Sequence, residues 1–207
     1  MTPVKVLAVQ YLSAAGEDLC RALGAPAGYP CLGLITTDCD DATYIALDEA
    51  TKASEVQVCF GSSFYAGAAN ASTPYAGEVL GILCAATPGA VRSGMESCVS
   101  ALERLGFEQA GEVPYLAHTV SSCGSFLAQE AGVAEGSSLA YLIAPPLESM
   151  YAMDHALKAA DVRLCKLYAP PSPTNFGGGL LTGTRSACAA ACSAFAEAVA
   201  EVAQKPK

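Results

Sequence analysis

"YIALDEATKASEVQVC", residues 44 to 59, returns later in the chain as "MYAMDHALKAADVRLC", residues 150 to 165. The two segments align without a gap at a constant offset of 106 residues. Self-similarity of this kind marks a repeated structural unit and is sought before any single motif is interpreted. The matched positions include Asp48 and Asp154, Lys52 and Lys158, and Cys59 and Cys165.

The similarity continues on both sides of these segments. Upstream, "LAVQYLSAAGEDLCRALG" (7–24) parallels "LAHTVSSCGSFLAQEAG" (116–132), with an offset of 108 over its second half. Downstream, "AVRSGMESCVSALERL" (90–105) parallels "ACAAACSAFAEAVAEV" (187–202) at an offset of 97. The fall in offset gives the first copy about nine extra residues before its last element. The chain is therefore two copies of one unit, and the first copy carries an elaborated loop at about 61–77.

Each copy shows the same order of local patterns. Runs of β-branched residues alternate with helical periodicity and predict strand, short helix, strand, helix, strand, strand, helix. In the first copy, helices are predicted over 42–54 and 89–105, the second beginning after Pro88 and ending at Gly106. We therefore predict an α+β protein of two tandem domains, with boundaries at 1–106 and 107–207.

Two segments at equivalent places in the copies are predicted as loops. "GSSFYAGAANASTPYAGE" (61–78) and "APPSPTNFGGGLLTG" (169–183) are rich in Gly, Ser, Thr and Pro. They are interpreted either as plain surface connections or as a gate, because matched flexible loops in duplicated halves would surround one pseudo-symmetry axis.

Composition excludes several classes of protein. The 207 residues are 52% hydrophobic and carry a net charge of −9, which argues against nucleic acid or an anionic membrane as partner. We find no apolar run near the roughly 18 to 20 residues that a membrane span needs, and predict a cytosolic protein. The ten Cys are expected to be thiols, since most lie within strand or helix patterns in a reducing compartment.

No catalytic constellation can be assembled from the sequence. It contains no GxxxxGK[ST], GxSxG, HExxH or CxxC motif. The two His are assigned to a strand (His118) and to a helix surface (His155), and Cys188 and Cys192 share an Ala-rich helix face typical of core packing.

Three carboxylates crowd the turn between a predicted strand and the helix at 42–54. Asp38, Asp40 and Asp41 stand there within four residues. One interpretation is a helix cap, because Asp is favoured at the N-cap and in the first turn. A cap needs only one acid, however, and three acids repel one another unless a cation or hydrogen-bond donors offset them.

Five long collinear segments carry a resemblance to a known family. They are "LGLITTDCDDATYIALDEATK", "YAGAANASTPYAGEVLGIL", "AYLIAPPLESMYAMDHALKAADV", "PPSPTNF" and "LLTGTRSACAAACSAFAEAV". From about residue 30 to 203 the chain resembles the large tandem-domain shell proteins of bacterial microcompartments, most closely the ethanolamine-utilisation (EutL) type. The resemblance implies two circularly permuted microcompartment domains per chain and three chains in a flat pseudohexamer that tiles with other shell proteins in the cytoplasm. It implies small pores, a gated central opening and no catalysis.

The resemblance also implies a ligand site. A small ammonium such as ethanolamine has three donors and one charge, which suit clustered carboxylates and an aromatic face. Of the residues carried over, Phe107 rests on a single aromatic after Gly. The resemblance also implies a zinc association at Glu148. The alternative interpretation is that Glu148 is an ordinary surface residue, because one carboxylate alone is a weak metal site. The implied ligand residues are Asp40, Asp41, Glu78, Phe107, Thr174, Asn175 and Phe176.

Two other hypotheses stay open on the sequence. The chain could be a shell protein of the same type from another compartment, one for ethanol, propanediol or choline, because its first 30 residues lack a clear counterpart in the family. It could instead be a small-molecule-binding regulatory or enzymatic α+β protein that uses the acidic cluster.

Overall fold

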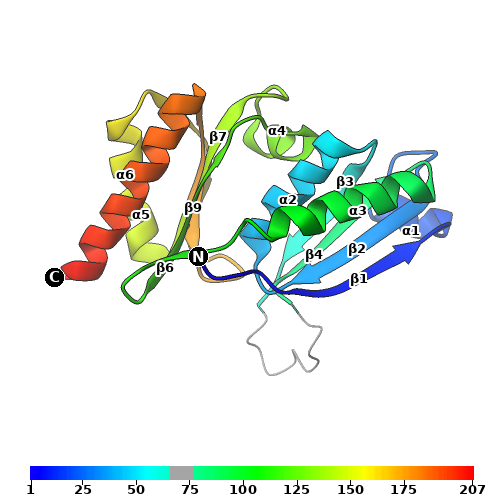
Figure 1. The fold of residues 1–207 in the computed structure, drawn as a ribbon, viewed down its shortest axis with the longest axis horizontal. Helices are drawn as coiled ribbons and strands as arrows, with labels where there is room; N and C mark the ends of the chain where they lie inside the picture. Colours follow the sequence, from blue (N-terminus) through cyan, green and yellow to red (C-terminus); the bar gives the residue numbers. More distant parts are fainter. Residues whose placement is uncertain (66–76) are drawn as a thin grey trace. The chain divides into compact units, whose positions relative to one another are not determined.

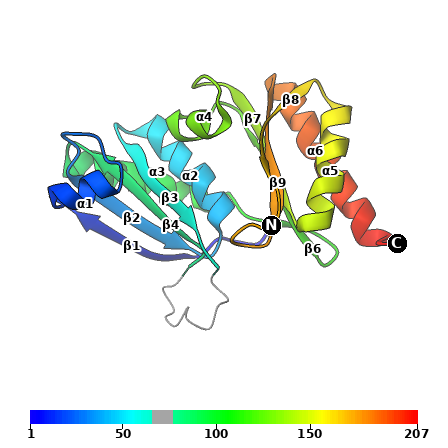
Figure 2. The ribbon, with the colours of Figure 1, turned by 180° about the vertical axis from the view of Figure 1, so that it is seen from behind.

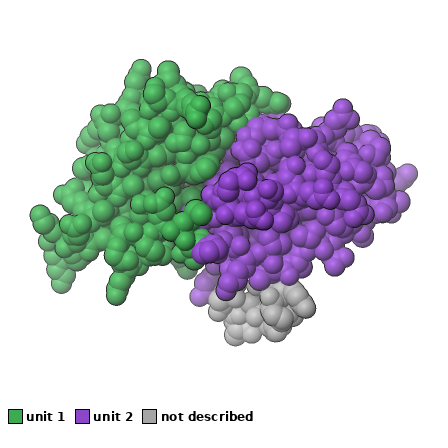
Figure 3. All heavy atoms as spheres, in the orientation of Figure 1, with its two compact units in different colours: residues 1–2, 107–123, 128–207 green, residues 3–106, 124–127 purple. Residues whose placement is uncertain are grey.

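The protein is described by a computed structural model, which covers residues 1–65 and 77–207. Two compact units make up the chain, coloured separately in Figure 3. Unit 2 holds residues 3–106 and 124–127, and unit 1 holds the remainder, 1–2, 107–123 and 128–207. The domains 1–106 and 107–207 differ from these units in two short segments, and as boundaries of the family's domains they stay a prediction.

Unit 2 is a four-stranded antiparallel sheet in the order β1-β2-β4-β3. Helices α2 and α3 pack together on one face of this sheet (Figure 1). A Cβ at Gly33 of β2 would lie 2.7 Å from Val91 and 2.9 Å from Met95, so this strand and α3 are in close contact. The elements are β1 (Val6–Leu12), α1 (Glu17–Ala22), β2 (Cys31–Thr37), α2 (Asp40–Ala53), β3 (Gln57–Ser63), β4 (Val79–Ala85) and α3 (Pro88–Leu102).

The opposite face of this sheet has a smaller core. Leu32, Ile82 and Cys84 are buried there, and Leu23 and Ala25 pack against them from the end of α1. Successive side chains of a strand point to opposite faces, which is why Leu32 and Gly33 of one strand serve two different helices.

Unit 1 is an antiparallel sheet in the order β5-β6-β7-β9-β8. Helices α5 and α6 pack against each other and against this sheet, as the view from behind also shows (Figure 2). Phe195 and Cys188 of α6 are fully buried in its core. The elements are β5 (Glu108–Ala110), β6 (Val113–Val120), α4 (Ser125–Ala131), β7 (Ser138–Ala144), α5 (Pro146–Ala159), β8 (Val162–Tyr168), β9 (Gly177–Gly183) and α6 (Arg185–Gln204).

The predicted order of elements is confirmed in both copies, with β5 as an addition. The offset of 106 also holds in detail. The β3–β4 register shifts between Val58 and Phe60, and the β8–β9 register shifts between Leu164 and Lys166, so the repeated Cys59 and Cys165 occupy matching irregularities. Such a bulge re-aims the strand locally, and its recurrence shows that the two copies share backbone geometry as well as sequence.

The short helices α1 and α4 end in the same way. Gly24 and Gly132 follow them with φ of 75° and 63°, the left-handed conformation that favours glycine after a helix. The next N–H closes each end, from Ala25 to the Cys20 carbonyl at 2.9 Å and from Val133 to the Ala128 carbonyl at 3.0 Å.

The predicted loop at 169–183 is wrong over its second half. Residues Gly177–Gly183 form β9, an interior strand of the unit 1 sheet. The triple glycine belongs to this strand because neighbouring backbone approaches closely: a Cβ at Gly178 would lie 1.9 Å from the Leu142 carbonyl oxygen. In the first copy, Gly61–Ser63 likewise belongs to β3, and residues 66–76 of the predicted loop lie outside the described residues.

The prediction that no segment is apolar enough for a membrane span was too strict. In the part of the chain that the structure describes, α6 alone is long and apolar enough by length and composition, with a mean hydropathy of 1.3. Core helices of soluble proteins pass the same test, and α6 owes its hydropathy largely to Ala. Its buried residues include Cys188, Phe195 and Val199.

Candidate functional site

The acidic turn is built where β2 ends and α2 begins. The N-cap of α2 is Cys39, and Asp40 and Asp41 form the start of the helix. Both carboxylates are nearly enclosed, with 6% and 7% of each residue exposed, whereas Asp38 is exposed and accepts a hydrogen bond from the Lys5 backbone N–H at 2.7 Å. Asp40 and Asp41 are thus buried carboxylates, which proteins keep only where other groups compensate them.

Threonines, rather than the acids, hold the turn. The Cys39 N–H donates to the Thr37 hydroxyl at 3.1 Å, and the Thr43 hydroxyl donates to the Cys39 carbonyl at 2.8 Å. Asp40 Oδ1 accepts the Asp41 N–H at 2.9 Å. The helix-cap interpretation therefore explains only one oxygen of Asp40, which accepts a backbone N–H in the first turn of α2. The N-cap position itself is held by Cys39.

Glu78 joins the cluster from the start of β4. Its backbone N–H donates to the Thr37 carbonyl at 2.8 Å, which ties it to the end of β2. Burial, followed by the charges of Asp40 and Asp38, raises the pKa of Glu78 to about 7. Burial also raises the pKa of Asp40, against the opposing effect of a hydrogen bond with Ser63. The structure thus brings three predicted ligand residues of unit 2, Asp40, Asp41 and Glu78, into one turn region.

Ser63 also belongs to this cluster, although the sequence pattern did not predict it. Its hydroxyl lies 2.7 Å from the Tyr44 hydroxyl, besides its bond with Asp40. Ser63 pairs with Val79 across the β3–β4 ladder, so a strand assignment that reached 63 would have placed it beside Glu78. The Gly- and Ser-rich composition hid that signal by favouring a loop.

We expect Glu78→Gln to change how stability depends on pH. A carboxyl whose pKa is higher in the folded state binds more protons than in the unfolded state, so wild-type stability should fall as pH rises from about 4.5 to about 7. Gln carries no charge at any pH, and the variant should lose that part of the decline. Urea denaturation at pH 4.5, 6 and 8 measures the free energy of unfolding of both proteins, and the exposed Glu55→Gln is the control. Parallel pH profiles for wild type and Glu78→Gln would contradict the assignment.

The other predicted ligand residues lie in unit 1. The rings of Phe107 and Phe176 meet edge to face, with centroids 5.2 Å apart. Asn175 has a φ of 62° in a turn closed by its own N–H to the Ser172 carbonyl at 3.2 Å, and the Ser172 hydroxyl donates to the Phe176 carbonyl at 2.7 Å. Asn175 is exposed, and Thr174 beside it is half-buried. The convergence of this set with the acidic cluster on one ligand stays a prediction.

Known proteins similar to this chain decide its family. A family model described as "BMC domain" matches residues 31–114. The bacterial microcompartment shell protein EutL of Clostridium perfringens (strain 13 / Type A) is 54% identical over 205 residues, 97% of this chain and 94% of that protein. The chain belongs to the EutL family of bacterial microcompartment shell proteins.

Solved structures agree with this family. The crystal structure of the ethanolamine utilization protein EutL from Leptotrichia buccalis C-1013-b matches with a TM-score of 0.96 and 55% identity, covering 99% of this chain and 96% of that one. EtuB from Clostridium kluyveri, with a TM-score of 0.78 and 20% identity over 96% of this chain and 88% of its own, shares the fold. The family's domain match begins at β2 and not at β1, as it would in a circularly permuted domain.

As a EutL family member, the chain is a structural component of a microcompartment shell and not an enzyme. This decides against the hypothesis of an enzymatic α+β protein. The fold prediction of two tandem permuted microcompartment domains is confirmed. The location within the cell is likewise that of a microcompartment shell.

The zinc association at Glu148 stays a prediction. Glu148 lies in the first turn of α5 and is half-buried. Across residues 1–65 and 77–207, no group of three or more His, Cys, Asp or Glu side chains is arranged to hold a metal ion.

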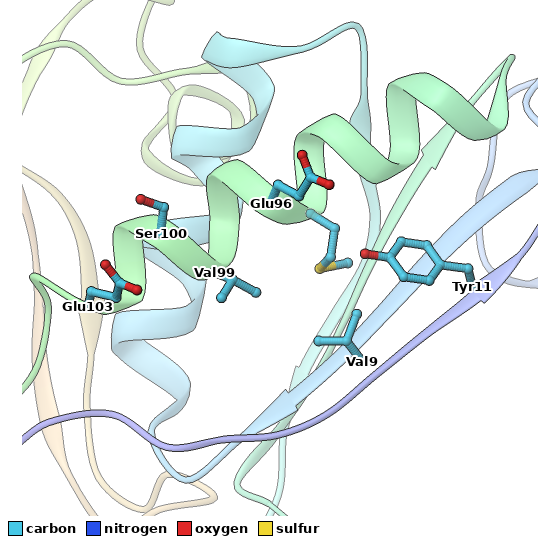
Figure 4. A pocket seen from close by; sticks show the side chains of 7 residues that line it. Val9, Tyr11, Glu96, Val99, Ser100 and Glu103 are labelled. Carbon is cyan, nitrogen blue, oxygen red and sulfur yellow. The ribbon is translucent and has the colours of Figure 1, made fainter.

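The surface of unit 2 also has a hollow that contains none of the predicted ligand residues. It has a volume of about 390 Å³ between β1 and α3, and Figure 4 shows Tyr11 and Val9 of the strand facing Glu96 and Val99 of the helix. It shares no residue with the predicted ligand site. Its lining residues are Val9, Tyr11, Met95, Glu96, Val99, Ser100 and Glu103.

Proposed function

We propose that this chain is a trimeric tile in the shell of an ethanolamine-utilisation microcompartment. The observation that carries the proposal is the 54% identity to a EutL shell protein along 97% of the chain. The crystal structure of the Leptotrichia buccalis protein, whose name is ethanolamine utilization protein EutL, supports the same proposal at 55% identity. Two repeats per chain and three chains would give six similar units around one ring, and closed cyclic symmetry is the usual outcome for soluble homo-oligomers.

The tile also binds a small amine at the acidic cluster. Three carboxylates of unit 2, two of them nearly buried, create a site where a cation relieves their mutual repulsion. An ammonium group offers three donors to these acceptors, and the hydroxyl of ethanolamine can exchange hydrogen bonds with side chains such as Thr174 and Asn175. The edge-to-face pair of Phe107 and Phe176 supplies aromatic surface for the carbon atoms and for a cation–π contact.

A gated central opening completes the proposal. Its predicted mobile elements were the segments 61–77 and 169–183. Only 169–176 of the second segment connects two strands, and most of the first lies outside the described residues. Within the described residues, the proposed gate therefore consists mainly of the segment 169–176 between β8 and β9.

Native mass spectrometry and sedimentation test the tile. Three chains of 21.0 kDa give about 63 kDa, and this species should dominate at micromolar concentration. At high protein concentration, electron microscopy should show flat arrays formed through the tile edges. A chain that stays at 21.0 kDa across salt and concentration would rule out the trimer.

A further inference from the structure

Asp48 makes a contact that joins the two sequence repeats. It lies on α2 in the first repeat, is fully buried, and accepts the backbone N–H of Gly124 at 2.7 Å and of Leu127 at 2.8 Å. Thr51, one turn further on, accepts the Ser125 N–H at 3.2 Å through its hydroxyl. These partners belong to the second repeat, yet residues 124–127 pack with unit 2.

The repeat predicts a second contact of the same kind. Asp154 on α5 corresponds to Asp48, and Gly16 and Leu19 correspond to Gly124 and Leu127. In the chain itself, Asp154 is exposed over 58% of its side chain and pairs with Lys158 at 2.6 Å. No side chain caps α1 at its N-cap Gly16. Both halves of the second contact are therefore present and exposed.

The two glycines show the asymmetry most clearly. A Cβ at Gly124 would lie 2.2 Å from the Thr51 hydroxyl and 2.7 Å from the Asp48 carbonyl oxygen, so the close approach of α2 requires glycine there. Gly16 has a φ of −61° and a ψ of 142°, which other residues adopt readily, and a Cβ on it would meet nothing within 4 Å. Among residues 1–65 and 77–207, nothing requires glycine at position 16, but a neighbour approaching as α2 approaches Gly124 would.

Apolar exposure follows the same division. Leu127 is 1% exposed, and its counterpart Leu19 is 46% exposed. On the helices, Ile45 of α2 is 1% exposed, whereas Tyr151 at the matching position of α5 is 38% exposed. One face of α5 and the start of α1 thus carry apolar side chains in water whose counterparts are buried in the other copy.

Charges at these surfaces are partly complementary. Glu17 and Asp18 follow Gly16, where the other copy has Ser125 and Phe126. On α5, Lys158 pairs with Asp154 at 2.6 Å, and His155 stands in the position of Glu49, so this face has one acid fewer than the matching face of α2. Lys158 therefore offsets part of the repulsion between Asp154 and the acidic start of α1.

We propose that a second copy of this chain covers these surfaces. Asp154 of one copy accepts the backbone N–H groups of Gly16 and Leu19 of the next, and Leu157, at the position of Thr51, packs over Gly16. Each chain gives one such contact and receives one, a head-to-tail arrangement that closes into a ring or continues as a filament. This seam rests on the proposed trimer, whose chain-to-chain contact it specifies.

Two variants test the seam at exposed positions. Gly16→Ala removes no side-chain contact, and Asp154→Asn removes only the exposed ion pair with Lys158. Gly16→Ala and Asp154→Asn should each raise the protein concentration at which the trimer dissociates by at least tenfold, measured by analytical ultracentrifugation across dilution. Circular dichroism and the thermal midpoint of the dissociated chain should be unchanged, because both residues are exposed there. Matched controls are Gly89→Ala, where a Cβ would also meet nothing within 4 Å, and Glu197→Gln on the exposed side of α6. Both should dissociate as wild type does.

Hydrogen exchange gives a second readout. The amides of residues 16–19 should gain protection when wild type assembles, and Asp154→Asn should lose that gain. A trimer that both variants leave intact, with amides 16–19 unprotected, would overturn the seam while the proposed tile stands. A monomeric wild type would overturn the tile and, with it, the seam.

Discussion

Asp48→Ala should lower the free energy of unfolding by about 2 to 4 kcal/mol, a large share of the roughly 5 to 15 kcal/mol of a typical domain. The Gly124 and Leu127 N–H groups would lose their acceptor inside a site where Asp48 is fully buried. Each buried donor left without an acceptor costs about 1 to 3 kcal/mol, and relief from burying the charge offsets part of this. Burial raises the pKa of Asp48, and those two N–H donors oppose the rise.

Urea denaturation followed by circular dichroism measures this effect. The control is Glu49→Ala on the same helix, whose partly exposed ion pair with Lys52 should contribute less than about 1 kcal/mol. Residues 124–127 should also exchange their amide protons faster in Asp48→Ala. Equal stability of Asp48→Ala and Glu49→Ala would show that the two N–H groups do not depend on the carboxylate.

Changing Asp40 and Asp41 together to Asn should remove ethanolamine binding, with at least a tenfold loss of affinity. The double variant keeps the shape of the site but removes two charges that would face the ammonium. Wild-type binding should itself be weak, since four heavy atoms give at most about 6 kcal/mol, a Kd of about 40 µM at the tightest. Calorimetry at millimolar ligand or ligand-soaked crystals can measure it.

The pH dependence adds an independent check on the same site. Glu78 has a pKa of about 7, so its carboxylate is largely protonated at pH 6 and ionised at pH 8, and wild-type affinity should rise over that interval. The control removes two carboxylates elsewhere in unit 2, Glu96→Gln with Glu103→Gln in the hollow of Figure 4, and should bind as wild type does. If the Asp40 and Asp41 double variant bound ethanolamine as tightly as wild type, these acids would have no role in binding and would serve only the first turn of α2.

The repeat was the part of this protein that the sequence determined most fully. Offsets of 108, 106 and 97 identified the two copies. Strand and helix periodicity then predicted the order of elements within each copy, because it depends on neighbours within a few residues. The helix predicted at 42–54 is found as α2 (Asp40–Ala53), and the helix at 89–105 as α3 (Pro88–Leu102). The predicted clustering of acids at the start of α2 also came from local spacing.

Tertiary structure decided what local patterns could not. The glycines at 177–179 suggested a loop, but they form a strand because the backbone at Leu142 and Lys166 leaves no room for a Cβ at Gly178 and Gly179. Ser63 and Glu78 reach the Asp40 region through strand pairing across residues distant in the sequence.

The paired Asp48 and Asp154 show where this division lies. Sequence made them equivalent, at the same position of the same repeated helix. Within the single chain, structure made them different, because 124–127 packs against Asp48 and buries it, while Asp154 is exposed beside Lys158. Periodicity is set by neighbouring residues and can be read from the chain, but the burial of a charge depends on which distant backbone N–H groups reach it, and only the folded chain determines that.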